Sequence, residues 1–310
     1  MSQAATVSVA SAPRQARLRF RKTRDRIIES LMLLAALVAV LTTAAIVYIL
    51  VSESLPFFRH VSLHDFFTDT MWTPMFDQAH YGIMPLVAGT IVTTVVALCL
   101  AIPCGTIIAI YLSEFAPYRV REVVKPALEL LGAVPTVVYG YFALQMVTPF
   151  LQKFIPGLPG FNMLSPGLVI GIMIIPYVAS VSEDAMRAVP NYMREGSYAM
   201  GATRFQTATR VVVPGALSGI AAAYILGISR AVGETMVVAV AAGLQPNLTW
   251  NPLESAATIT AFIVQVSLGD LPHGSIGYQS IFAAGLVLMV TTLVFNIAGF
   301  LLTRRFREVY

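Results

Sequence analysis

The chain has 310 residues, of which 57% are hydrophobic and 12% are charged, with 20 Lys and Arg against 16 Asp and Glu. Soluble domains carry roughly 25% charged residues, so this chain has too few charges to cover a surface that faces water. The composition excludes a soluble enzyme and a disordered chain, and it indicates a protein whose solvent is the lipid bilayer.

Long stretches without any charge follow one another along the chain. A helix needs about 20 apolar residues to cross the hydrocarbon layer, and barrel strands instead alternate apolar and polar residues over about 10 positions. We therefore predict an all-α, single-domain integral membrane protein. Its six transmembrane helices are expected at about 28–52, 84–112, 127–150, 166–182, 216–242 and 280–303.

The basic residues alternate between the connections of these helices. Seventeen of the 20 fall on one side of the membrane and two on the other, while Arg230 lies inside a predicted helix. Basic residues mark the cytoplasmic side, so we predict a cytoplasmic N-terminal arm over 1–27 and a cytoplasmic tail over 304–310. The arm is interpreted as a topology anchor; a patch for anionic lipid or nucleic acid is the alternative, and no nucleic-acid partner is expected.

Several sequence motifs of catalysis and cofactor binding are missing. The sequence contains no G-x-x-x-x-G-K-[ST], no H-E-x-x-H, no G-x-S-x-G and no cysteine cluster. We expect no catalytic residue, no metal and no cofactor in this chain. His60 and His64 are spaced i, i+4 and would share a metal on one helix, but a solvated pair is favoured because no third ligand is evident.

Two charges stand inside the fifth predicted helix, Arg230 and Glu234. The i, i+4 spacing puts them on one face, and each costs roughly 2.5–3.5 kcal/mol at the bilayer centre, so they should face protein or a water-filled path. One interpretation is an ion pair that only packs helices. The favoured one is a pathway site, in which the arginine fork meets an oxyanion and Glu234 partly neutralises it so that the anion is released.

Proline and tryptophan mark further features of the spans and their outer connections. Pro135, with Gly140 nearby, predicts a break in the third helix that either packs small residues or lines and gates a pore. Trp72 and Trp250, in the outer connections, are predicted to anchor at the membrane interface. Residues 255–269 are charge-free but too short to span, which predicts a re-entrant or interfacial segment.

The cytoplasmic connection over about 183–216 is expected to form short helices broken at Pro190 and Gly201. An amphipathic turn of this kind either docks into a groove on a partner or lies on the bilayer surface. The connection resembles the loop motif E-A-A-x3-G-x9-I-x-L-P of ABC importer permeases, with small residues retained at Gly196 and Ser197. The resemblance implies a coupling segment that docks on an ATPase subunit and includes Glu195, Gly196, Gly201 and Pro214.

A finer resemblance covers almost the whole chain and points to the permeases of phosphate-specific transport systems. It is carried by the segments 112–117, 132–140, 182–190, 230–235 and 269–274. It implies a type I ABC permease in the inner membrane that translocates phosphate, with Arg230 and Glu234 in its passage. The implied partners are a sister permease (PstA-like), ATPase subunits (PstB-like) that hold ATP and Mg, and a periplasmic phosphate-binding protein (PstS-like). A permease for sulfate or molybdate and a passive anion channel are the alternatives.

Overall fold

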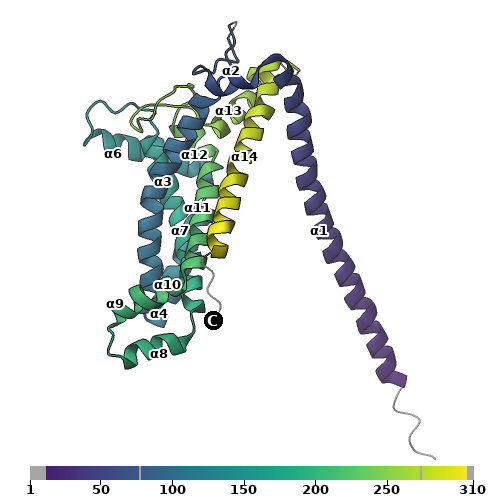
Figure 1. Ribbon diagram of the computed structural model, residues 1–310, viewed down its shortest axis with the longest axis vertical. Coiled ribbons are helices and arrows are strands. Elements are labelled where there is room, and N and C mark those ends of the chain that lie inside the picture. The colour runs from purple at the N-terminus through teal and green to yellow at the C-terminus, as the bar shows by residue number, and fades with distance from the viewer. Residues whose placement is uncertain (1–11, 77, 273, 306–310) are drawn as a thin grey trace, which may run out of the picture. The chain divides into compact units, whose positions relative to one another are not determined.

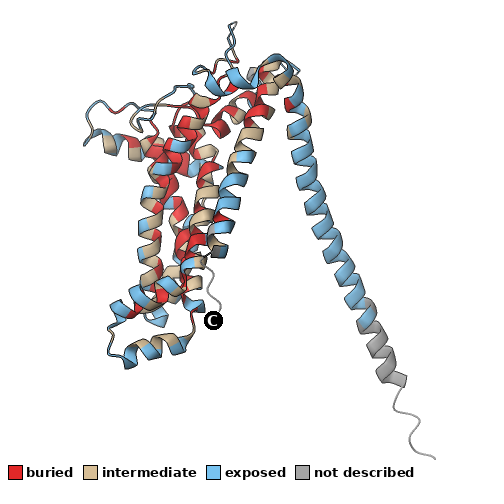
Figure 2. Cartoon of the chain, in the orientation of Figure 1, coloured by how far each residue is buried: buried red, intermediate tan, exposed pale blue. Residues whose placement is uncertain are grey.

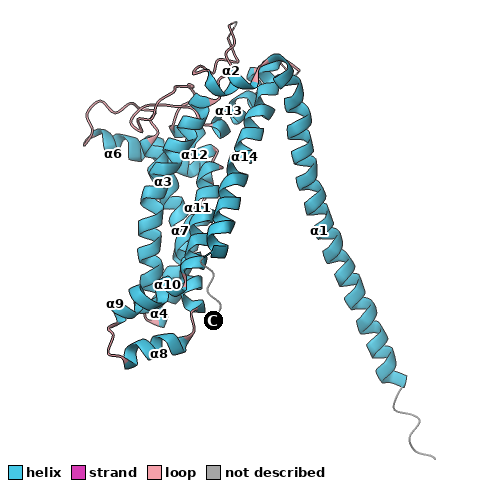
Figure 3. Cartoon of the chain, in the orientation of Figure 1, coloured by secondary structure: helices cyan, strands magenta, loops and turns pink. Residues whose placement is uncertain are grey.

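The computed structural model describes residues 12–76, 78–272 and 274–305 (Figure 1). Figure 3 shows that the regular structure in these residues is helical, and an isolated antiparallel bridge joins Trp72 to Tyr81. The predicted all-α class is therefore confirmed. The chain divides into two compact units, residues 1–52 and 53–310, and each is described by itself.

The first unit consists of most of α1 (Ala12–His60). Its candidate span is Arg24–His60, so the helix is considerably longer than the predicted 28–52. The helix continues beyond its apolar part into the basic arm because arginine, glutamine and lysine are good helix formers. The apolar residues therefore indicate which part of the helix lies in the bilayer, but they do not indicate where the helix begins. Residues 1–11 of the predicted arm and 306–310 of the predicted tail lie outside the described residues.

Four long helical segments run alongside one another in the second unit (Figure 1). They are α3 (Met84–Ile110), which the π-helical turn η1 (Tyr111–Phe115) extends, α7 (Leu164–Ala188), α11 (Leu217–Val232) and α14 (Ile276–Arg305). Figure 2 shows the buried residues gathered where these helices meet. Small residues bring the backbones close: a Cβ added to Gly171 of α7 would lie 2.8 Å from the Ala97 carbonyl oxygen of α3.

The third predicted helix is not continuous. Pro135 separates α4 (Tyr118–Ala133) from α5 (Thr136–Phe142), and the two arms meet at 87°. The second arm continues through η2 (Ala143–Val147) and α6 (Thr148–Gln152). The predicted break at Pro135 is confirmed, but the single helix over 127–150 is wrong, because proline lacks an amide hydrogen and disfavours helical backbone in the residue before it.

The fifth predicted helix, 216–242, is also interrupted. It ends at Val232, residues 233–235 are not helical, and α12 (Met236–Ala241) follows. On its N-terminal side α9 (Arg204–Thr207), η3 (Ala208–Val212) and α10 (Val213–Gly215) precede α11, with a bend of 72°. Among the described residues, four single helices are long and apolar enough to span, and the two bent pairs bring the number to the predicted six.

The two ends of the helical bundle carry different short elements. α2 (Leu63–Thr68) and α13 (Ile259–Gln265), followed by η4 (Val266–Asp270), lie at one end, and α8 (Asn191–Ala199) and α9 lie at the other (Figure 1). The short helix α13 confirms that the segment over 255–269 does not span by itself. Its residues 259–262 are buried against the bundle.

Trp72 belongs to an aromatic cluster at the α2 end. Its side chain is only 1% exposed and packs edge-on against Phe262 at 5.0 Å and Phe66 at 6.2 Å. The prediction of an interfacial anchor is therefore wrong for Trp72, whereas Trp250 is 63% exposed. Burial of a large aromatic ring against other rings stabilises the fold more than a position at the membrane interface does.

His60 and His64 do not share a helix face. His60 ends α1 and His64 lies in α2, with non-helical backbone between them. The Nδ1 atom of His60 lies 2.9 Å from the Pro56 carbonyl oxygen, and His64 faces Asp65 and Thr68. The two rings would share a metal only if they lay on one helix, and they do not.

Candidate functional site

Arg230 lies in the last turn of α11, next to the break in the fifth span. Its guanidinium carbon is 4.7 Å from the centroid of the Tyr177 ring of α7, which is a cation–π contact. Its Nε atom is buried without a hydrogen-bond partner. Within the described part of the chain, the ion pairs do not include Arg230. The guanidinium therefore lies in the protein interior, where its positive charge interacts with an aromatic ring.

Glu234 lies in the break itself and is 7% exposed. Its Oε1 accepts a hydrogen bond of 3.4 Å from the Val237 amide in the first turn of α12, where a carboxylate is favoured by the helix dipole. Its backbone carbonyl accepts a hydrogen bond of 2.7 Å from the Thr260 hydroxyl. These bonds stabilise the irregular backbone at the break.

The predicted shared helix face of Arg230 and Glu234 is therefore wrong. Their spacing assumed a continuous helix, but the helix ends at Val232, between them. Gly233 and Thr235 are weak helix formers, and the contacts of Glu234 with α12 and Thr260 replace the missing helical hydrogen bonds. Both charges adjoin one break, and each has its own partner there.

Gly140 and Pro135 shape the packing next to this break. A Cβ on Gly140 would lie 3.0 Å from the Val240 Cβ and 3.1 Å from the Met236 carbonyl oxygen, so glycine lets α5 approach α12 closely. The Tyr139 hydroxyl donates to the Leu131 carbonyl oxygen at 2.6 Å and so bridges the bend at Pro135. Gly140 thus packs helices, and a pore-lining role for Pro135 stays a prediction.

An open pocket of about 360 Å³ lies between α4 and α7. This volume is within the range of ligand pockets. Tyr177, whose ring faces the guanidinium, is part of the pocket wall. The other lining residues are Glu129, Gly132, Ala133, Pro176, Ser180 and Val181.

The predicted coupling segment forms short helices that break at the predicted positions. Pro190 is the N-cap of α8, and Gly201 follows α8 with φ of +83°, a left-handed conformation that favours glycine. Glu195, Gly196 and Pro214 are exposed. Large apolar side chains on the same segment are exposed as well: Tyr192 by 63%, Phe205 by 66% and Met200 by 88%.

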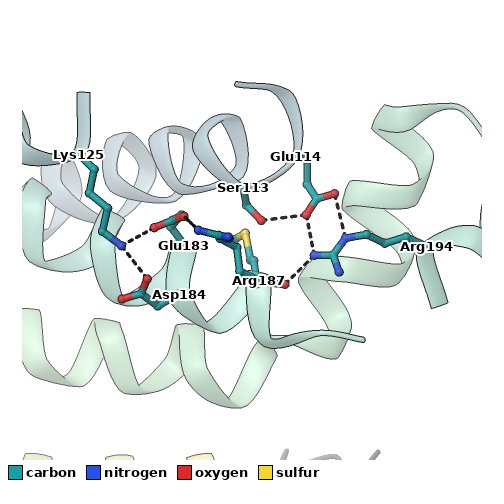
Figure 4. Close-up of polar contacts among 8 residues, drawn as sticks. Ser113, Glu114, Lys125, Glu183, Asp184, Arg187 and Arg194 are labelled. Carbon is teal, nitrogen blue, oxygen red and sulfur yellow. Dashed lines mark hydrogen bonds and ion pairs between the residues drawn. The ribbon is translucent and has the colours of Figure 1, made fainter. Parts of the chain in front are cut away.

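Arg194 ties α8 to the ends of two spans (Figure 4). Its guanidinium donates to the Glu114 carboxylate of η1 at 2.9 and 3.3 Å. It also donates to the carbonyl oxygens of Met186, at the end of α7, and Val189 at 2.8 and 2.5 Å. A displacement of α8 would therefore be transmitted to α3 and α7 through one side chain.

A second ion-pair group joins α4 to α7 at the same end (Figure 4). Lys125 donates to Glu183 and Asp184, both at 2.6 Å, and Arg187 lies 3.5 Å from Glu183. The Glu183 side chain is completely buried. A buried carboxylate is tolerated only when cations or donors face it, so Lys125 fixes the middle of α4 against the C-terminal part of α7.

Sequence reasoning missed the roles of Tyr177, Glu114, Arg194, Lys125 and Glu183. Glu114 and Glu183 do stand where long apolar stretches end, which is a local signal of a span end. The pairing of these residues has no local signal, because the partners are far apart in the chain. Tyr177 lies in an apolar segment and has no distinguishing neighbour in sequence.

Residues 101–308 match the family of binding-protein-dependent transport system inner membrane components. The chain is 35% identical to the probable ABC transporter permease protein YqgH of Bacillus subtilis, over 84% of each protein. It is 32% identical to the phosphate transport system permease protein PstC of Mesorhizobium japonicum, over 77% of this chain and 78% of that one.

The fold is also similar to that of solved ABC transporters. A crystal structure of a bacterial alginate ABC transporter, in complex with a periplasmic protein that holds an alginate pentasaccharide, contains a chain that matches with a TM-score of 0.63. The two chains are 17% identical, and the match covers 93% of this chain and 98% of that one. The protein therefore belongs to the family of binding-protein-dependent transport system inner membrane components, as a multi-pass ABC transporter permease.

Proposed function

We propose that this chain is the translocation subunit of an ATP-driven importer of inorganic phosphate, and that Arg230 contacts the anion as it passes. The observation that carries the proposal is the Arg230 guanidinium, which stacks on Tyr177 without a carboxylate partner at a break in a span. A guanidinium that is not neutralised keeps its planar fork of donors for an oxyanion. The phosphate-transport relatives supply the substrate class.

The proposed mechanism is alternating access driven by partners. An ATPase subunit would hold ATP and Mg, dock on the segment that includes Glu195, Gly196, Gly201 and Pro214, and move α8. The Arg194–Glu114 contact would pass that movement to α3 and α7. Irregular backbone at membrane depth is tolerated where it lines a cavity, so the break at 233–235 fits a path that opens to either side.

The other partners follow from the same proposal. A sister permease would complete the translocation path, and a periplasmic phosphate-binding protein would deliver the anion at the end that carries α2 and α13. The end with α8 would then be cytoplasmic, in an inner membrane, with both chain termini on that side. This orientation agrees with the excess of Lys and Arg in the connections there.

The test of the site uses the complete importer in proteoliposomes, with labelled phosphate and ATP. We expect Arg230→Ala to lower uptake at least about tenfold per assembled complex, and Arg230→Lys to recover only part of it, because lysine keeps the charge without the planar fork. Co-purification of the ATPase subunit measures assembly. Normal uptake by Arg230→Ala would refute the site.

The test of coupling uses two glycines in the same backbone conformation. Gly201 and Gly157 have φ of +83° and +85°, and an added Cβ meets no atom within 4 Å at either position. Gly201→Glu is expected to weaken ATPase docking or abolish stimulated hydrolysis, while Gly157→Glu carries the same backbone strain outside the segment. If both variants dock the ATPase equally well, the coupling role of the segment is rejected.

Two competing functions are separated by simpler measurements. Sulfate or molybdate would be the substrate if an excess of either suppressed labelled phosphate uptake as strongly as unlabelled phosphate does. A passive anion channel would conduct without nucleotide, so uptake that persists after ATP depletion would favour it over an importer.

A further inference from the structure

We propose that Tyr177 is the positioning residue for Arg230, and that its ring, rather than a carboxylate, holds the guanidinium ready for phosphate. The inference rests on the proposed function of Arg230 and adds the group that orients it. Tyr177 lies in α7 and Arg230 in α11, so the contact joins two spans at the side of the α4–α7 pocket.

The choice of partner decides what the guanidinium can still bind. A carboxylate would occupy hydrogen-bond donors of Arg230 and cancel its charge. The Tyr177 ring attracts the cation through its face at 4.7 Å and accepts no conventional hydrogen bond from it. Arg230 is therefore held in place without a carboxylate on its donors, which suits an anion that must bind and leave again.

The surroundings keep the Tyr177 ring in this position. A Cβ on Gly132 of α4 would lie 3.3 Å from the Tyr177 hydroxyl oxygen and 3.5 Å from its Cε2 and Cζ atoms, so the absence of a side chain there leaves the ring its space. The hydroxyl faces the pocket wall and forms no hydrogen bond with the described residues. Removing the hydroxyl alone would thus leave the ring and its packing intact.

The acidic residue Glu129 lines the same pocket, together with Ser180. An anion that moves from Arg230 into this pocket would meet a like charge, which opposes tight retention. Tyr177 therefore stands between a group that attracts phosphate and a space that favours its departure. This position explains why an aromatic ring holds the arginine better than an acid would.

The experiment measures ATP-dependent phosphate uptake of the complete importer in proteoliposomes, per complex assembled with its ATPase subunit. Tyr177→Leu removes the ring face and is expected to lower uptake at least about fivefold, whereas Tyr177→Phe retains it and should stay within about twofold of the parent. Tyr224→Leu is the matched control, since Tyr224 is a half-buried tyrosine of α11 that contacts Thr106 instead of Arg230.

A double variant separates a positioning role from a general structural one. If Tyr177 acts through Arg230, Tyr177→Leu should cause no further loss in the Arg230→Ala background, because contacting residues are not additive. Three outcomes would each overturn the inference alone. The first is a double variant whose loss of uptake equals the product of the two single losses, and the second is a loss for Tyr177→Phe as large as that for Tyr177→Leu. The third is normal uptake by Tyr177→Leu while Arg230→Ala has lost uptake. Normal uptake by Arg230→Ala would overturn the proposed function and the inference together.

Discussion

The guanidinium of Arg194 forms two hydrogen bonds with the carboxylate of Glu114, although the residues are 80 positions apart. The Glu114 side chain is 5% exposed and that of Arg194 is 14% exposed, so water screens the pair little. The contact joins the short helix α8 to the end of the long helix α3. It links the proposed docking segment to the end of a span through side chains alone.

Loss of this link should uncouple transport from hydrolysis. Arg194→Ala removes two of the hydrogen bonds to the nearly buried Glu114 carboxylate and leaves it the bond from the Ser113 hydroxyl. Hydrogen bonds to a charged group contribute about 1.5–3 kcal/mol. We expect more ATP hydrolysed per phosphate imported, measured in the same vesicles, and Glu114→Gln should act in the same direction. Arg119→Ala is the control, because Arg119 is an exposed arginine of α4. An unchanged ratio in both Arg194 and Glu114 variants would rule the link out.

Glu234 contributes a hydrogen bond to the fold and a negative charge beside the proposed path, and two substitutions distinguish these contributions. Glu234→Gln retains an oxygen that accepts the Val237 amide, so assembly should be preserved, while Glu234→Ala loses this hydrogen bond, which to a charged acceptor contributes about 1.5–3 kcal/mol. We expect Glu234→Gln to lower uptake at least about fivefold at normal assembly, because the negative charge beside the path is lost. Uptake at the parental level would assign Glu234 to the fold alone.

The two tryptophans, Trp72 and Trp250, should respond very differently to truncation. Trp72→Ala removes the centre of the aromatic cluster with Phe66 and Phe262 and should destabilise the chain by about 3–5 kcal/mol. Trp250→Ala changes an exposed side chain and should stay within about 0.5 kcal/mol. Thermal unfolding of the purified permease in one detergent measures both. Equal shifts would contradict the burial of Trp72.

Asp69 and His80 predict an acid-sensitive connection between α2 and α3. Burial alone would raise the pKa of Asp69, but hydrogen bonds from His80 and the Met71 amide, with the charge of His80, hold that pKa below its ordinary 3.8. A depressed carboxyl pKa contributes stability above its unfolded value, and this contribution is lost as the pH falls through the folded value. The connection should therefore loosen only below about pH 4.

Hydrogen exchange of the Met71 amide, which donates to Asp69 at 3.0 Å, reports this change directly. After correction for intrinsic exchange, protection should fall on acidification from about pH 5 to about pH 2 in the parent chain. Asp69→Ala, which has no acceptor for this amide, should show low protection throughout this range. A parental protection that does not depend on pH would contradict the assignment.

Several features of the helix breaks follow directly from local chemistry. Pro135 predicts the bend between α4 and α5 because its ring removes a backbone donor, and Pro190 predicts the start of α8 for the same reason. Gly201 predicts the end of α8 because glycine adopts the positive φ found there. The break after Arg230 is less evident in the sequence. Gly233 weakens a helix by only about 1 kcal/mol, which the surroundings can override in either direction. Here the Thr260 contact and the capping by Glu234 favour the break.

The helical class, the number of candidate spans and the residues that do not belong in lipid follow from the order of the amino acids. Each charge in hydrocarbon has an unfavourable free energy that depends little on the other residues, so counting charges along the chain is sufficient. Which charges and rings meet depends on the packing of the helices. Lys125 and Glu183 are 58 positions apart, and Tyr177 and Arg230 lie on different helices. Such partners depend on the angle and depth at which helices pack, and these properties arise from all side chains of the interface together.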